Sequence, residues 1–115
     1  MLRGEIRLVD LDPTQRGEAD KRHPAVVVSN DGANTTAARL GHGVVTVVPV
    51  TSNVDRVYPF QVLLPGAETG LDRDSKAQAE QVRSVSVERV SRKLGAVPPG
   101  LMLAVDDALR LHLAL

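Results

Sequence analysis

Two uninterrupted runs of β-branched residues constrain the fold of this chain more than any other feature. Residues 24–29 read PAVVVS, and residues 43–51 read GVVTVVPVT. Valine and threonine are favoured in strands, and continuous apolar runs of this length are typical of strands covered on both faces. Weaker strand patterns extend the expected sheet at 5–11, 60–64, 76–87 and 93–97.

One segment has a convincing helical pattern. After Pro98-Pro99-Gly100, apolar residues repeat every four positions at Leu101, Val105, Leu109 and Leu113, a spacing that places them on one helix face. A second, short helix is expected over 34–40. The pattern predicts a small α+β domain, mainly β, in which a helix packs against a strongly bent antiparallel sheet.

The composition excludes several kinds of catalytic, metal and base-stacking site. A length of 115 residues suits a single domain over 1–115. The chain has no cysteine, which excludes disulfides, thiol catalysis and cysteine-ligated metals. Its three histidines are scattered without metal-ligand spacing, so we expect neither a metal nor another cofactor. Tyr58 and Phe60 are its only aromatic residues, too few for a base-stacking platform.

Charge and hydropathy limit the partners. The chain has 14 basic and 14 acidic residues, giving a formal net charge of zero, so contacts with nucleic acid are expected only on a local patch. The apolar runs are too short to cross a bilayer, which needs about 20 residues. The N-terminal residues show no apolar signal region, and we therefore expect a cytoplasmic protein that does not contact membranes.

Five segments, taken in order, resemble the MazF/PemK (Kid-like) family of toxin endoribonucleases. They are RGEI with DLDP in 3–13, GE with KRHPAVVVSN in 17–30, VVPVTS with YPFQV in 47–62, DS at 74–75 and EQVRS at 80–84. The resemblance implies an SH3-like small barrel with a C-terminal helix, assembled as a homodimer. It also implies a type II toxin that cuts single-stranded RNA, chiefly mRNA, at short sequences without a metal. The implied products are a 2′,3′-cyclic phosphate and a 5′-hydroxyl, and the implied protein partner is a cognate MazE-like antitoxin.

The resemblance also implies the catalytic pair. Thr51 matches the family's threonine, but the family's arginine before the proline is replaced by His23, with Arg22 one residue earlier. In one hypothesis His23 exchanges the proton, since an imidazole ordinarily titrates near pH ~6.5. In the other, Arg22, or Arg16 from the polar loop at 14–22, supplies the cation while His23 orients the phosphate.

Further polar residues are candidates for binding RNA. Ser52 and Asn53 follow Thr51 and form a polar rim at the expected strand end, and Glu18 shares the polar loop with Arg16. The resemblance places Glu80, Gln81, Arg83 and Ser84 along an RNA groove, where amide and carboxylate groups pair with splayed base edges. Arg89, Arg92 and Lys93, by contrast, are expected to form a solvated patch.

Two other functions share the predicted fold. A CcdB-like gyrase inhibitor needs an aromatic C-terminal tip, whereas this sequence ends Leu113-Ala114-Leu115, which favours the nuclease. A second alternative is a catalytically inactive SH3-like interaction module, because the arginine before the proline is absent. Fold alone does not separate these functions.

Overall fold

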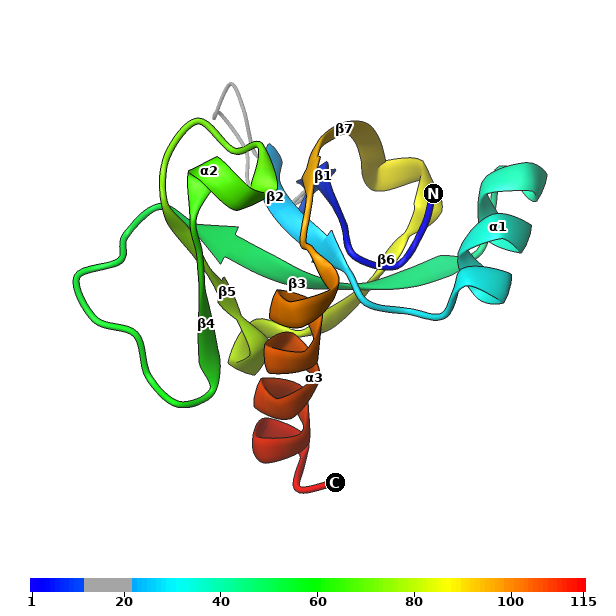
Figure 1. Ribbon diagram of the computed structural model, residues 1–115. Coiled ribbons are helices and arrows are strands. Elements are labelled where there is room, and N and C mark those ends of the chain that lie inside the picture. The colour runs from blue at the N-terminus through cyan, green and yellow to red at the C-terminus, as the bar shows by residue number, and fades with distance from the viewer. Residues whose placement is uncertain (12–21) are drawn as a thin grey trace, which may run out of the picture.

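Antiparallel strands form one bent sheet in the computed structural model, which describes residues 1–11 and 22–115 (Figure 1). In this part of the chain the seven strands are β1 (Glu5–Asp10), β2 (Arg22–Val27), β3 (Val44–Thr51), β4 (Gln61–Leu64), β5 (Ser75–Gln78), β6 (Arg83–Ser86) and β7 (Val90–Ala96). Their order is β4-β5-β3-β2-β1-β7, with β6 also paired to β3. No ladder joins the edge strands β4 and β7 among the described residues, so the predicted barrel is bent but not closed.

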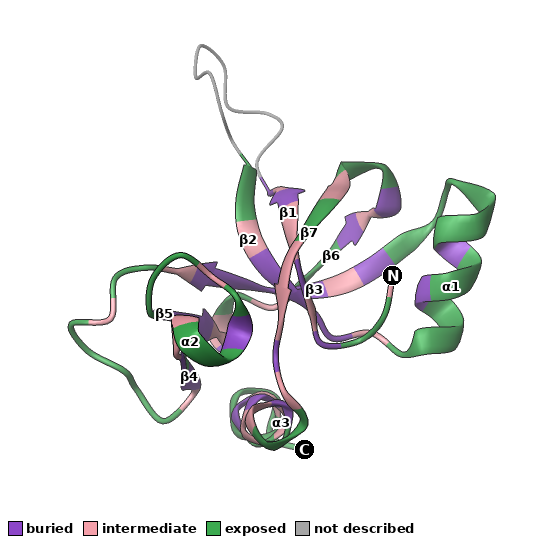
Figure 2. Cartoon of the chain, turned by 45° about the horizontal axis from the view of Figure 1, so that its top comes forward, coloured by how far each residue is buried: buried purple, intermediate pink, exposed green. Residues whose placement is uncertain are grey.

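The two β-branched runs lie at the centre of the sheet as β3 and β2. Successive side chains of a strand point to opposite faces. Val26 and Val48 are therefore buried in one apolar cluster, while Val27 and Val47 are buried in a second cluster on the other face. Figure 2 shows this central burial in contrast to the exposed surface of the helix α1 (Asp31–Leu40). The prediction that both runs are covered on both faces is confirmed.

The strand predicted over 76–87 is divided, and Pro49 explains where. The Val28 N–H donates to the Thr46 carbonyl over 2.9 Å, so alternate residues of β3 starting from Thr46 direct their backbone groups toward β2. The nitrogen of Pro49 therefore faces the opposite edge, where it has no hydrogen to donate. β5 and β6 pair with β3 on either side of this position, and the 3-10 turn η1 (Ala79–Gln81) and Val82 connect them.

The helices differ in detail from the expectation. α1 begins three residues before the predicted helix, because the Asn30 side chain accepts a hydrogen bond from the Ala33 N–H over 2.8 Å and caps it. A one-turn helix, α2 (Gly66–Thr69), follows the strand predicted over 60–64. The last strand, β7, begins at Val90 and not at Lys93.

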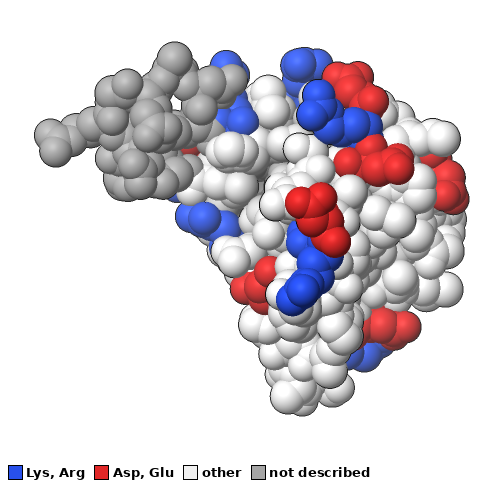
Figure 3. All heavy atoms as spheres, turned by 90° about the vertical axis from the view of Figure 1, so that its left-hand side faces the viewer, with Lys and Arg blue, Asp and Glu red and all other residues white. Residues whose placement is uncertain are grey.

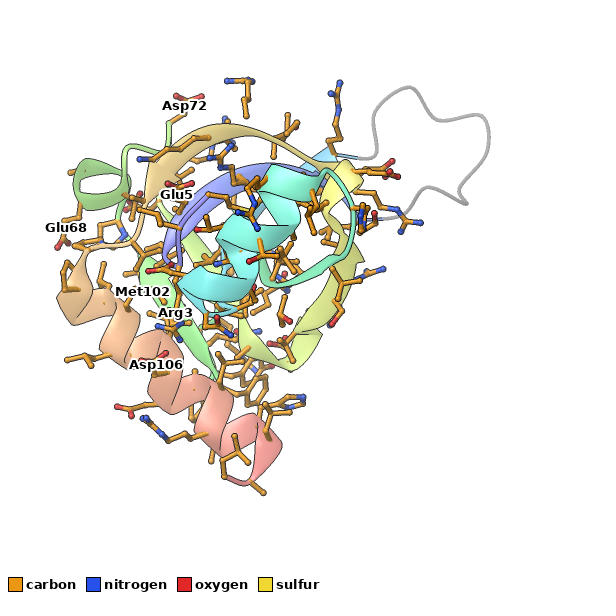
Figure 4. All side chains as sticks on the ribbon, turned by 90° about the vertical axis from the view of Figure 1, so that its right-hand side faces the viewer. Arg3, Glu5, Glu68, Asp72, Met102 and Asp106 are labelled. Carbon is orange, nitrogen blue, oxygen red and sulfur yellow. The ribbon has the colours of Figure 1, made fainter. Side chains whose placement is uncertain are left out.

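The C-terminal helix α3 (Pro99–Leu113) packs against the sheet as predicted, beside β4 and η1. Its buried face consists of Met102, Val105 and Ala108, whereas Leu113, predicted on that face, is exposed. A salt bridge between Arg3 and Asp106 joins the N-terminal segment to the helix, and Figure 4 shows the two side chains directed toward each other. The predicted apolar stripe is therefore confirmed in the first part of α3, and the prediction is wrong at the end of the helix.

Candidate functional site

His23 and Thr51 come from neighbouring strands and lie on the same side of the sheet. β2 and β3 pair with Ala25 opposite Pro49. Extended by two residues, this register places His23 opposite Thr51, and directly opposed residues of antiparallel strands direct their side chains to the same face. Arg22 precedes His23 on β2, so its side chain leaves from the other face. The structure therefore associates Thr51 with His23 and not with Arg22.

Both residues line a cavity of about 720 Å³ at the end of β3. Its walls come from the start of β2, the end of β3, the segment that runs from Gly70 to β5, and the middle of β7. Ser52 of the predicted polar rim is also in the wall, whereas Asn53 is not among the described lining residues. A volume of this size is in the range of pockets that hold small ligands. The described lining residues are Leu11, His23, Pro24, Pro49, Val50, Thr51, Ser52, Gly70, Leu71, Asp72, Arg73, Ser75, Gln78, Arg92, Lys93 and Leu94.

The hydroxyl of Thr51 has a defined hydrogen-bonding role. It accepts a hydrogen bond from the Asn53 N–H over 3.2 Å, and the Asn53 side chain in turn accepts one from the Asp55 N–H over 3.2 Å. These bonds shape the loop after β3. A hydroxyl has one proton and two lone pairs, so the Thr51 proton stays available for an acceptor in the cavity, such as a phosphoryl oxygen.

Lys76 also fixes the loop that follows β3, through a hydrogen bond. It lies opposite Thr51 in the β3–β5 register and is buried, with its ammonium group donating to the Arg56 carbonyl over 2.5 Å. Sequence reasoning did not single out this residue. A lysine in an alternating strand looks like part of a solvated face, and only the pairing of β5 with the end of β3 shows that it fixes the loop beside the candidate site.

The other predicted site residues do not line the cavity in the described part of the chain. Arg16 and Glu18 lie outside the described residues, so their predicted role is not addressed by the structure. Arg83 and Ser84 are exposed on β6, opposite Val47 and Thr46. Val47 is four residues from Thr51, roughly 13 Å along the strand. Arg83 and Ser84 are therefore not part of the cavity but lie further along the same edge of β3.

Glu80 and Gln81 lie on the turn η1, which connects β5 to β6, and not on a strand. Gln81 is exposed. The Glu80 carboxylate accepts a hydrogen bond from the buried Gln61 side chain over 2.7 Å, and its other oxygen is buried without a hydrogen-bond partner in the described part of the chain. Gln61 also accepts from the Tyr58 N–H. Gln61 thus orients Glu80 and ties it to the loop before β4.

Three basic residues that were not predicted to belong to the site also line the cavity. They are Arg73, Arg92 and Lys93. We expected Arg92 and Lys93 to belong to a solvated patch; both are exposed, but they face the same cavity as His23. The β1–β7 ladder contains two register shifts, so the residues of β7 that lie beside the cavity are not readable from spacing alone.

A metal-ligand cluster and a membrane-spanning helix are both absent from the part of the chain that the structure describes. Within 1–11 and 22–115, no three histidine or acidic side chains come together in a way that would hold a metal. In the same part of the chain, no helix combines the length and the apolar character required to cross a membrane.

The chain matches a protein-family model over residues 2–113, that of the PemK-like, MazF-like toxins of type II toxin–antitoxin systems. The chain belongs to this family. It is 60% identical over 115 residues to endoribonuclease MazF9 of Mycobacterium tuberculosis, covering 100% of this chain and 98% of that protein. It is also 31% identical over 114 residues to endoribonuclease MazF of Staphylococcus epidermidis, covering 98% and 91%.

Solved structures of MazF toxins share the fold. One, an endoribonuclease in complex with its cognate antitoxin from a mycobacterial species, aligns with a TM-score of 0.76 and 25% identity over 100% of this chain and 96% of that one. Family membership confirms the resemblance drawn from the sequence motifs. The comparisons favour neither a CcdB-like gyrase inhibitor nor an inactive SH3-like module.

Proposed function

We propose that this MazF-family toxin is an endoribonuclease that cuts single-stranded RNA without a metal ion. The observation that carries the proposal is that His23 and Thr51 line one cavity whose wall also contains three basic side chains. Extension of the β2–β3 register brings the two residues opposite each other. A scissile phosphate needs a proton acceptor on one side, a hydrogen-bond donor for its oxygens and positive charge around it. The relatives named MazF endoribonucleases support the same activity.

The proposed reaction uses the 2′-hydroxyl of the RNA as the nucleophile. Its oxygen forms a bond to phosphorus while the bond from phosphorus to the 5′-oxygen breaks, and the product is a 2′,3′-cyclic phosphate. His23 accepts the proton of the 2′-hydroxyl, and a protonated group or water returns one to the leaving 5′-oxygen, giving a 5′-hydroxyl. The Thr51 hydroxyl donates to a phosphoryl oxygen, which gains negative charge in the transition state.

The proposal includes a second copy of the chain. Leu103, Leu111 and Leu113 of α3 are 66%, 57% and 48% exposed. On the face seen in Figure 3, the lowest part, at the height of the end of α3 in Figure 1, is free of charged side chains. An apolar surface of this kind is typical of an interface. Sedimentation at micromolar concentration should therefore give a dimer, and a species of only 12.3 kDa would contradict this part of the proposal.

The proposal also includes an antitoxin as protein partner and a location in the cell. The similarity to an endoribonuclease solved with its cognate antitoxin supports a MazE-like partner for this chain. Because the proposed substrate is cellular RNA, chiefly mRNA, the expected location is the cytoplasm.

The decisive experiment maps the ends of cleaved RNA. The purified protein is incubated with a long transcript in EDTA, and the fragments are sequenced. We expect cuts at a short recurring sequence, 5′ ends that a polynucleotide kinase phosphorylates directly, and 3′ ends that resist ligation until the cyclic phosphate is removed. An intact transcript would exclude the nuclease, and cleavage that EDTA abolishes would exclude the metal-free mechanism. Inhibition of DNA gyrase without RNA cleavage would instead support the CcdB-like alternative.

A further inference from the structure

The basic wall of the cavity is formed by two segments that are far apart in the sequence. Arg73 lies on the connection between α2 and β5, and Arg92 and Lys93 lie on β7. All three side chains are exposed. His23 and Thr51 are contributed by other strands, β2 and β3, so these cations are additional to the catalytic pair.

The three cations have no hydrogen-bond or ion-pair partner among the described residues, unlike Arg3, Arg7 and Arg110, which form salt bridges. Asp72 is the only carboxylate in the described lining of the cavity, and Figure 4 shows it at the outer edge of its loop. Three cations against one carboxylate leave a local surplus of two positive charges in a chain whose formal net charge is zero. Like charges gathered in this way repel one another, and an anionic ligand relieves that repulsion.

The two segments are held together by a close backbone contact. A Cβ atom on Gly95 would lie 2.1 Å from the Thr69 carbonyl oxygen, so only glycine allows β7 to approach the end of α2 this closely. α2 ends at Thr69 and is capped by Gly70, which has a φ of 85° in the left-handed region. Arg73 follows Thr69 by four residues, and Lys93 precedes Gly95 by two. The contact therefore fixes the separation of the two halves of the basic wall.

We propose that Arg73, Arg92 and Lys93 form a second phosphate subsite, which binds the RNA backbone phosphate next to the one that is cleaved. This inference rests on the proposed nuclease function. The cavity of about 720 Å³ is larger than a single phosphate requires. Arginine presents a planar fork of donors that matches phosphate oxygens, and lysine adds a compact charge. Bound in this way, the neighbouring phosphate positions the scissile one between His23 and Thr51.

The test measures how RNA binding depends on salt. For single strands, the logarithm of the binding constant falls with the logarithm of salt concentration by about 0.7 for each phosphate neutralised. The probe is a fluorescent oligonucleotide that carries a mapped cleavage site with 2′-deoxyribose at the attacked nucleotide, so that it binds without being cut. In Arg92→Gln/Lys93→Gln we expect the slope to decrease by about 0.7 and the affinity at low salt to fall by about tenfold or more.

A matched double variant separates this subsite from a general effect of charge. Arg39→Gln/Arg110→Gln also removes two positive charges, but Arg39 is exposed on α1 and Arg110 on α3, and neither lines the cavity. We expect this control to keep the salt slope of the unmodified protein. Equal slopes in all three proteins, or an equal loss in both variants, would overturn the subsite.

Cleavage of the all-ribose oligonucleotide by the unmodified protein is measured in the same series. If that protein cleaves RNA and the variants share its salt slope, the subsite is wrong and the nuclease stands. If it neither cleaves nor binds RNA, the proposed function fails and the subsite fails with it. A reduced slope in Arg92→Gln/Lys93→Gln alone supports the subsite. Arg73→Gln should then reduce the slope as well, since the two segments act on one phosphate.

Discussion

The basic residues at the N-terminus and those at the cavity differ in how their charge is balanced. Arg3 bonds to Asp106 and to the Val28 carbonyl, and Arg7 bonds to Glu5 over 2.8 Å. The cations of the cavity wall have no such partner among the described residues. The chain contains as many acidic as basic residues, so pairing was available to both regions. Arg3 joins the N-terminal segment to α3, and Arg7 also donates to the Ser91 carbonyl of β7. The unpaired cations leave their donors available to an anionic ligand.

The first prediction assigns the chemistry within the unpaired region, and it has the largest expected effect. His23→Gln should lower the rate of RNA cleavage by roughly 10² to 10⁴, the usual contribution of a general base. An imidazole must be neutral to accept a proton. Activity of the unmodified protein should therefore fall on acidification, and the fall should be absent from the residual activity of His23→Gln.

Arg22→Gln is the matched variant, because Arg22 precedes His23 on β2 and leaves from the other face. We expect it to retain activity within about tenfold and to keep the acid limb of the pH–rate profile. Both variants are measured at fixed ionic strength, so that salt effects on RNA binding do not enter. Loss of cleavage in Arg22→Gln while His23→Gln stays fully active would reverse the assignment.

The second prediction concerns the Thr51 hydroxyl. Thr51→Ala removes a donor to the phosphoryl oxygen, which should lower the cleavage rate by about 10² to 10³. It also removes the acceptor of the Asn53 N–H, at a cost of about 1 kcal/mol in the free energy of unfolding. Single-turnover cleavage and urea denaturation measure the two effects separately.

Thr51→Ser keeps the oxygen and is the control. It should retain activity within about tenfold, because the serine hydroxyl both accepts from Asn53 and donates to the phosphate. If Thr51→Ser is as inactive as Thr51→Ala, the side chain acts through its methyl group and packing, and the hydroxyl has no special role.

The sequence predicted the framework of the fold well, because the framework depends on local patterns. The runs at 24–29 and 43–51 became the two central strands, and the apolar spacing after Pro99 became α3. The prediction of one strand over 76–87 was wrong for a reason that is not local. Its interruption depends on the edge of β3 toward which the nitrogen of Pro49 points, and that edge follows from the register between β2 and β3.

The candidate site was predictable only in part for the same reason. His23 and Thr51 were selected through the family resemblance and Ser52 through its place beside Thr51, and the structure brings all three to one cavity. Arg92 and Lys93 are joined to them only through pairings of β1 with β2 and with β7. The spacing of charges in a sequence shows which residues are solvated on average, but it does not show which cations from distant strands face one cavity.

The last prediction tests the paired region and has the smallest effect. Glu5 and Arg7 are mostly buried, with 14% and 23% of their side chains exposed. Burial alone raises the pKa of the Glu5 carboxyl, but hydrogen bonds from Arg7 and from the backbone of Leu2, with the neighbouring positive charges, outweigh it and hold the pKa below its usual value. A pKa that is lower in the folded chain stabilises the fold above the unfolded value of about 4.3, and this stabilisation is lost as the pH falls through the folded value.

Glu5→Gln should therefore lower the free energy of unfolding by about 0.5 to 1 kcal/mol at neutral pH, and the difference should shrink as the solution is acidified through the lowered pKa of the Glu5 carboxyl. Cleavage activity should not change, since Glu5 does not line the cavity. Glu68→Gln is the control, because Glu68 is exposed and without a partner among the described residues; it should alter stability at neither pH. Urea denaturation at one fixed protein concentration measures all three proteins, as the proposed dimer makes stability depend on concentration. A loss in Glu5→Gln that persists unchanged in acid would mean that the Glu5 side chain contributes by packing and not by its charge.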